Sequence, residues 1–177
     1  MKAELYLSKA YRSIYENDFE QALYWFEQAL GVEPDNADIH YRHSITSARS
    51  NLLDKALAHA RLAAKLAPDH KEYMLHFDRL RAKELTVMAR THLENSVEDR
   101  VFRSERAVSL LVRAGELDPL SVEVQIWLAI AYGEMAQYEA ALRTLREAYA
   151  LPQDEGIARQ LTELEQQLEN RLNKSSS

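Results

Sequence analysis

Two histidines, His40 and His43, stand three positions apart and come closest to a metal-binding pattern. On a helix this spacing places both imidazoles on one face, where they could provide two ligands of a zinc ion. The remaining ligands would have to come from distant segments, because the chain has no cysteine. Ordinary hydrogen bonding between helices accounts for the pair more simply. We therefore expect no metal and no cofactor.

The residue types that catalysis requires form no recognisable constellation. Without cysteine there is no thiolate nucleophile, and 4 scattered glycines leave no glycine-rich loop that could cradle a phosphate. The carboxylates of Glu163, Glu165 and Glu169 lie at the spacing of a solvated helix face rather than of an acid–base pair. We therefore expect a protein that is not an enzyme.

Composition and charge restrict the partners. The formal net charge of -6 argues against nucleic acid, whose phosphates select basic surfaces. The first residues lack the apolar core of a secretory signal, and no run approaches the length of a membrane span. We expect a cytoplasmic protein without a membrane partner. Few glycines and prolines favour a helical fold.

Four pairs of alanines seven positions apart stand within the same recurring apolar pattern. The pairs are Ala22/Ala29, Ala56/Ala63, Ala107/Ala114 and Ala141/Ala148. Larger apolar residues accompany each pair at helical spacing. Small residues at two fixed places let a neighbouring helix approach closely. Pro34 and Pro68 follow the first two pairs 34 positions apart, a period that indicates an array of repeated units.

Each alanine pair is preceded by a second helical segment. We expect these first helices over residues 3–15, 37–49, 71–93 and 122–135. Breakers between the two helices of a repeat include Asn17-Asp18, Asn51 and Asn95-Ser96. Short connections make the two helices antiparallel neighbours. A last helix is expected over 155–173, with one apolar stripe formed by Ile157, Leu161, Leu164, Leu168 and Leu172.

With these elements the chain resembles the tetratricopeptide repeat (TPR) family. Repeat one supplies the family's pattern as Ala10, Ala22, Phe26, Ala29 and Pro34; repeat four supplies Ala129, Tyr132, Tyr138, Ala141, Leu145 and Ala148. The resemblance covers residues 3–152. It implies an all-α fold, a right-handed superhelical solenoid of four helical hairpins with a C-terminal capping helix.

The expected organisation is a single TPR-like domain over residues 1–173. Its repeats span about 3–36, 37–70, 71–120 and 121–153; the capping helix spans 154–173, and residues 174–177 form a disordered tail. Pro68 and Pro119 are 51 positions apart, so the third repeat carries 17 extra residues. We therefore expect the third hairpin to be elongated.

A further stripe on the first helices is the candidate binding surface. In the TPR fold the corresponding places line the concave groove, where such proteins bind partners. The residues are Leu7, Tyr11, Tyr41, Arg42, Ile45, Arg49, Ile126, Trp127 and Ile130. An apolar floor flanked by arginines suits a peptide or helix with apolar anchors and some acidic residues. The expected function is a protein–protein interaction module: an adaptor, co-chaperone or assembly factor.

Several alternatives stay open at this point. Lys9, Ser13, His43 and Ser47 occupy places where the family packs large apolar groups, so rotated first helices could bury the stripe. The protein's own helices could also fill the groove. A structural role is possible, in which the last helix or the third hairpin forms a homodimer. Regulation of an enzyme or of a nucleic-acid-binding protein is a third alternative.

Overall fold

A computed structural model describes residues 2–94 and 99–175 of the chain. These ranges form nine α-helices and contain no strand. The helices are α1 (Lys2–Tyr15), α2 (Phe19–Leu30), α3 (Ala37–Arg49), α4 (Leu53–Leu66), α5 (Lys71–Glu94), α6 (Arg100–Leu117), α7 (Val122–Glu134), α8 (Tyr138–Tyr149) and α9 (Glu155–Ser175). The expected helix bounds agree within two residues; the predicted turn at Asn95-Ser96 lies outside the described residues. None of the described helices is long and apolar enough to span a bilayer.

Polar side chains fix where several of the helices begin. The Asp18 carboxylate accepts from the backbone N–H of Gln21 and starts α2, and the Asn36 side chain accepts from two backbone N–H groups at the start of α3. Asp99 and Ser121 do the same for α6 and α7. Each cap satisfies backbone donors that have no partner inside the helix.

Three of the hairpins turn through a residue in the left-handed conformation. Asn17, Asn51 and Ala136 have φ of 59°, 57° and 57°. In each turn the following residue donates its N–H to a carbonyl five positions back, as from Asp18 to Ser13 at 2.8 Å. This bond belongs to the Schellman motif that ends many helices. The repeated turn gives the first, second and fourth hairpins the same reversal.

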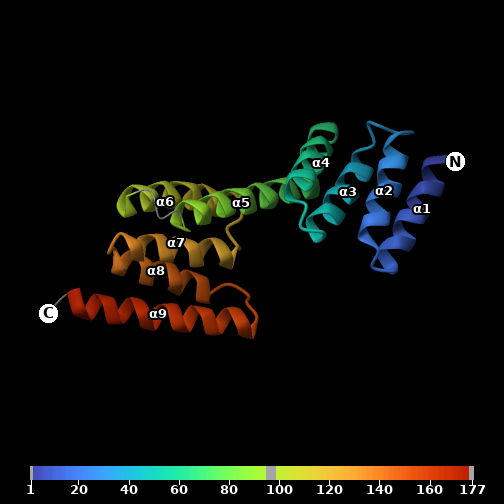
Figure 1. Cartoon of the computed structure of the whole chain (residues 1–177). Coiled ribbons are helices and arrows are strands. Elements are labelled where there is room, and N and C mark those ends of the chain that lie inside the picture. The colour runs from blue at the N-terminus through green and yellow to red at the C-terminus, as the bar shows by residue number, and fades with distance from the viewer. Residues whose placement is uncertain (1, 95–98, 176–177) are drawn as a thin grey trace. The chain divides into compact units, whose positions relative to one another are not determined.

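The chain divides into two compact units, Met1–Leu80 and Arg81–Ser177. In the first unit α1 packs on α2, α2 on α3 and α3 on α4 (Figure 1). One core cluster contains Ala10, Phe26, Ala29 and Ile39. A second contains Ala56, Leu57, Ala60 and Leu80, and so joins the first part of α5 to α4.

In the second unit α6 packs on α7, α7 on α8 and α8 on α9 (Figure 1). The later part of α5 contributes Ala82 and Ala89 to a core with α6 and α7. The stripe of α9 lies inside another core, where Leu161 and Leu168 are 0 % and 2 % exposed. The last helix therefore covers the fourth hairpin, and it also includes Lys174 and Ser175, which were expected in a disordered tail.

The repeated alanines are contact points between helices. All eight members of the four pairs are 0 % exposed. The third hairpin is elongated as expected: α5 has 24 residues and α6 has 18, whereas the helices of the other hairpins have 12 to 14. The fold is thus an all-α array of four helical hairpins followed by a covering helix.

Candidate functional site

The first helices of unit one carry a joined set of aromatic and charged side chains. The guanidinium of Arg42 on α3 lies 5.3 Å from the ring centroid of Tyr11 on α1, a cation–π geometry. Arg42 Nε also donates to Asp38 Oδ2 at 2.6 Å, one helical turn earlier on α3. This hydrogen bond raises the pKa of Arg42 above its ordinary value. Arg42 is therefore held in place between an aromatic ring and a carboxylate.

Tyr41 links α3 to the beginning of α5. Its ring lies 4.6 Å from that of Tyr73, and its hydroxyl donates to Glu72 Oε1 at 2.8 Å. Burial, followed by the Glu72 carboxylate, raises the pKa of Tyr41 to about 12. The Tyr73 hydroxyl in turn donates to Asp38 at 3.4 Å. Tyr41 consequently has a neutral phenol, and its hydroxyl hydrogen is already donated to Glu72 within unit one.

Buried Ser44 and half-buried His76 form a polar pair beside Tyr41. The Ser44 hydroxyl donates to the Ala56 carbonyl at 2.7 Å, so the His76 Nε2–H donates to the Ser44 oxygen at 2.8 Å. His76 also meets Tyr41 edge-on at 5.3 Å. Burial and the neighbouring Arg79 lower the pKa of His76. The pair fixes α5 against α3 and so holds Tyr41 in its position.

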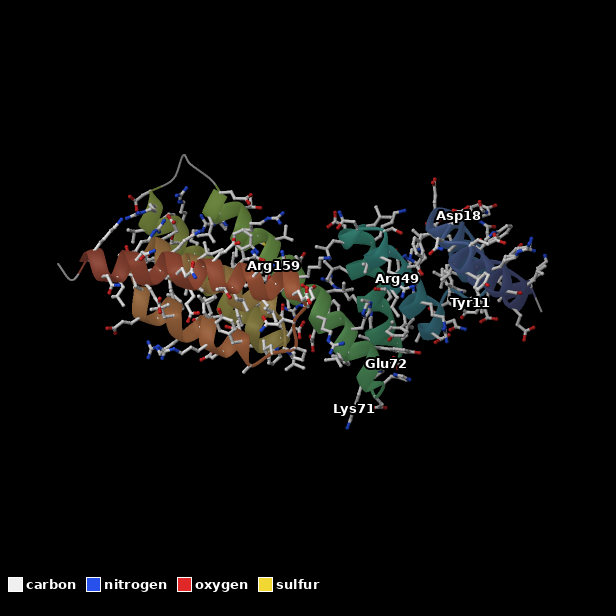
Figure 2. The ribbon with its side chains drawn as sticks, turned by 90° about the horizontal axis from the view of Figure 1, so that it is seen from below. Tyr11, Asp18, Arg49, Lys71, Glu72 and Arg159 are labelled. Carbon is white, nitrogen blue, oxygen red and sulfur yellow. The ribbon has the colours of Figure 1, made fainter. Side chains whose placement is uncertain are left out.

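The remaining predicted residues of this unit lie on the same helices. Leu7 and Ile45 are half-buried, and Leu7 packs beside the core of Ala10 and Phe26. Arg49 is exposed at the end of α3 (Figure 2). We call Tyr11, Tyr41, Arg42, Ile45 and Arg49 the first-helix surface. Its charge is mixed rather than basic, because Asp38 and Glu72 stand among the arginines.

The residues predicted in the second unit serve its packing. Ile126 is 4 % exposed in the core shared by α8 and α9, so the prediction that it lines a groove is wrong. Its stripe is buried because α9 covers that side of the fourth hairpin. Trp127 is half-buried against the α5–α6 core, and Ile130 is half-buried against the core that includes Leu168. Among the predicted residues that the structure describes, Tyr11, Arg42 and Tyr41 of unit one are connected, through Asp38 and Tyr73.

Sequence reasoning missed Asp38, Glu72 and Tyr73 as parts of this surface. Tyr73 follows Tyr41 by nearly one repeat length, and that spacing was the available signal. The two carboxylates gave no such signal, because acidic residues are common in the first turn of a helix. Their role follows from contacts between helices that only the fold defines.

His40 and His43 are hydrogen-bonded within unit one, and the bond between His40 and His59 joins α3 to α4. His40 contacts the Pro34 carbonyl at 2.9 Å and His59 on α4 at 2.8 Å, and His43 contacts Ser47 at 3.2 Å. Across the described residues, no group of three or more histidine, aspartate or glutamate side chains has an arrangement that could hold a metal.

Comparison with known proteins identifies the fold. No protein-family model matches the chain, and no curated protein matches it. Among solved structures it is similar to YrrB, described as a TPR protein with an unusual peptide-binding site (TM-score 0.55, 20% identity, 91% of this chain and 74% of that one). It is also similar to MamA 41-end from Desulfovibrio magneticus RS-1 (TM-score 0.55, 17% identity, 98% of this chain and 92% of that one). A third similar structure is yeast Tom70 (TM-score 0.52, 17% identity, 97% of this chain and 41% of that one). The chain therefore has the tetratricopeptide repeat fold.

Proposed function

We propose that the chain is a non-catalytic protein–protein interaction module, an adaptor, co-chaperone or assembly factor. It binds a peptide or helix on the first-helix surface. The observation that carries the proposal is the joined set of Tyr11, Arg42 and Tyr41, which crosses from α1 over α3 to α5 on partly exposed side chains. Tyrosine and arginine are the residue types that most often dominate protein interfaces.

The charges of the surface define the partner more narrowly. Arg49 is exposed, whereas Arg42 is already paired with Asp38. An acidic partner residue therefore meets Arg49 first, and it competes with Asp38 for Arg42. Half-buried Leu7 and Ile45 offer apolar contact beside these charges. The ligand is accordingly a segment with apolar anchors and a small number of acidic residues.

The fold supports this proposal in general terms. YrrB, of similar fold, is described as having a peptide-binding site. Helical-repeat proteins commonly bind elongated ligands along their stacked helices, and α1 and α3 of unit one carry the first-helix surface. Because unrelated roles share this fold, the proposal depends on the named side chains rather than on the likeness.

Affinity capture from a lysate of the source cells tests the proposal. The bait is the full chain, compared with Arg49→Glu and with Arg42→Gln. We expect one or more proteins to bind the wild type and to be lost from the Arg49→Glu bait, because the charge reversal repels their acidic residues. Titration of the captured protein should show at least a tenfold loss of affinity.

Lys65→Glu is the matched control. Lys65 is an exposed cation on α4, the second helix of the same hairpin, away from the named residues. It carries the same charge reversal and should leave binding intact. Equal capture by the wild type and the Arg49→Glu variant, or equal loss with Lys65→Glu, contradicts the proposed surface.

A further inference from the structure

Three histidines form a stacked cluster in the packing of α3 against α4. The rings of His43 and His59 are 3.7 Å apart and stacked, and those of His40 and His59 are 5.1 Å apart. His43 is 0 % exposed and His40 is 6 % exposed. His59 is half-buried. The cluster therefore lies in the packing of α3 against α4, and His43 stands at a place where the TPR pattern has a large apolar group.

The hydrogen bonds of the cluster fix the tautomers of His40 and His59 when both rings are neutral. The Pro34 carbonyl only accepts, so His40 Nε2 carries a hydrogen, and in a neutral ring His40 Nδ1 is then an acceptor. His59 Nδ1 donates to it at 2.8 Å. A further proton on His40 Nδ1 sets two N–H groups against each other. A proton at this position therefore breaks the bond or forces His59 into its other tautomer.

His43 has no group that could compensate a positive charge well. Its Nε2 is buried without a hydrogen-bond partner among the described residues. The facing carboxylate is that of Glu27 on α2, at 3.9 Å, too far for a hydrogen bond. Lys55 on α4 lies 3.9 Å from the same Glu27 oxygen and competes for it. The other titratable neighbours are His40 on α3 and His59 on α4, which repel the charge.

These surroundings depress both pKa values. Burial, followed by the charges of His59, Lys55 and His40, lowers the pKa of His43 to about 3. Burial, followed by His40 and Lys55, lowers that of His59 to about 4. In the unfolded chain both groups titrate near 6.5. The folded state is thus fully stable above that pH and loses stability as the pH falls toward 4.

We propose that His40, His43 and His59 form an acid-sensitive switch that opens the α3–α4 packing of unit one in mildly acidic solution, while unit two stays folded. Five of the 6 histidines belong to unit one, and only His92 belongs to unit two. Linkage predicts a folding equilibrium constant for unit one that falls roughly a thousandfold between about pH 6.5 and 4.5.

The switch has a consequence that rests on the proposed function. Helix α3 carries His40 and His43 on the side that meets α4, and it also carries Tyr41, Arg42 and Arg49. Opening of the α3–α4 packing removes the support of these residues. A partner bound at neutral pH is therefore released in acid.

Single-tryptophan variants separate the two units. The chain has 2 tryptophans, Trp25 in α2 and Trp127 in α7. Trp127→Phe leaves a reporter in unit one, and Trp25→Phe leaves one in unit two. Urea unfolding of each, followed by fluorescence from about pH 7.5 to 4.5 without any partner, should show the thousandfold loss for Trp25 and a far smaller loss for Trp127.

Removal of the titrating groups is the decisive variant. In His43→Phe/His59→Gln the phenyl ring keeps the stacking volume, and the glutamine amide is able to donate to His40. The pH dependence at Trp25 should largely disappear, whereas the matched control His92→Gln should retain it. An unchanged dependence in the double variant, or an equal acid response of Trp127, overturns the proposal.

Proton NMR titration of the wild-type histidines covers the case in which the double variant does not fold. The imidazole signals of His43 and His59 should not titrate between about pH 7 and 5.5, well above their depressed pKa values. Ordinary titration near 6.5 in the folded state also overturns the switch. Because neither measurement uses a partner, failure of the proposed binding function leaves this test intact.

Discussion

Single residues decide how the hairpins reverse. Asn17 and Asn51 suit a left-handed turn, because the short amide side chain tolerates positive φ better than most residues. Ala136 has the same conformation, with φ of 57°. In this conformation the Cβ of an alanine comes close to the following carbonyl oxygen, which costs about 1–2 kcal/mol. The left-handed turn therefore costs more free energy in the fourth hairpin than in the first two, where asparagine occupies it.

Replacement of Ala136 by glycine should relieve this strain. We expect Ala136→Gly to raise the free energy of unfolding of unit two by about 0.5–1 kcal/mol, the strain relieved less the entropy that glycine adds to the unfolded chain. Urea unfolding followed by Trp127 measures the change. Ala150→Gly is the matched control, because Ala150 has φ of -76° and gains nothing from glycine. Equal effects of the two substitutions would show that the turn is unstrained.

Residue identity also shows what the sequence could predict and what it could not. The alanine pairs indicated their own burial, because a small apolar residue that recurs at one place in each helix is typical of a close helix contact. The polar residues His43, Ser44 and Ser47 gave the opposite signal, yet all three are 0 % exposed. Their partners lie on other helices or one turn away, as with Ser44 and the Ala56 carbonyl. Without those partners, a polar residue at a packing position cannot be recognised as core.

At the scale of elements, the alanines set how closely helices approach. Ala56, Ala60 and Ala63 form one face of α4, and each is 0 % exposed. The helix bounds followed from the sequence because this periodicity ends at turn residues and N-caps. The binding stripe was harder to place: Ile126 has the same periodicity as Tyr41, but α9 covers it.

Enlargement of one of these contacts should separate the helices. Ala63→Leu inserts three carbon atoms into a filled interface and should lower the free energy of unfolding of unit one by about 1–3 kcal/mol. The Trp25 fluorescence reports the urea midpoint. Ala58→Leu is the control, since Ala58 is exposed on the same helix, and its effect should stay within about 0.5 kcal/mol. A tolerated Ala63→Leu would mean that the α4 packing is loose.

At the scale of the whole molecule, the repeats do not form one uniform core. The alanine pairs continue through all four hairpins, and the chain divides into two compact units at Leu80 and Arg81, inside α5. The reason lies in the extra length of the third hairpin. The first part of α5 packs with α4, and the later part packs with α6. One helix therefore contributes to two cores, and the sequence pattern of α5 contains no break that marks the change.

The apolar stripe of α9 can either cover the fourth hairpin or join two copies of the chain. A dimer formed through the apolar stripe of α9 needs Leu161 and Leu168 at its surface, but both are buried against α7 and α8. Each leucine makes core contacts within unit two, and truncation to alanine costs about 2–5 kcal/mol at such sites. We therefore expect Leu161→Ala and Leu168→Ala to lower the urea midpoint reported by Trp127. Gln160→Ala, at an exposed position of the same helix, should leave that midpoint unchanged.

Light scattering on the same variants separates the two roles of α9. If the stripe only covers the fourth hairpin, the mass in solution stays the same in the wild type and in both leucine variants, measured without denaturant. If it joins two copies, the leucine variants change the mass from two chains to one. Unit two would then keep its stability once the copies are apart. A drop in mass together with an unaltered Trp127 midpoint at low protein concentration would therefore support a homodimer formed through α9.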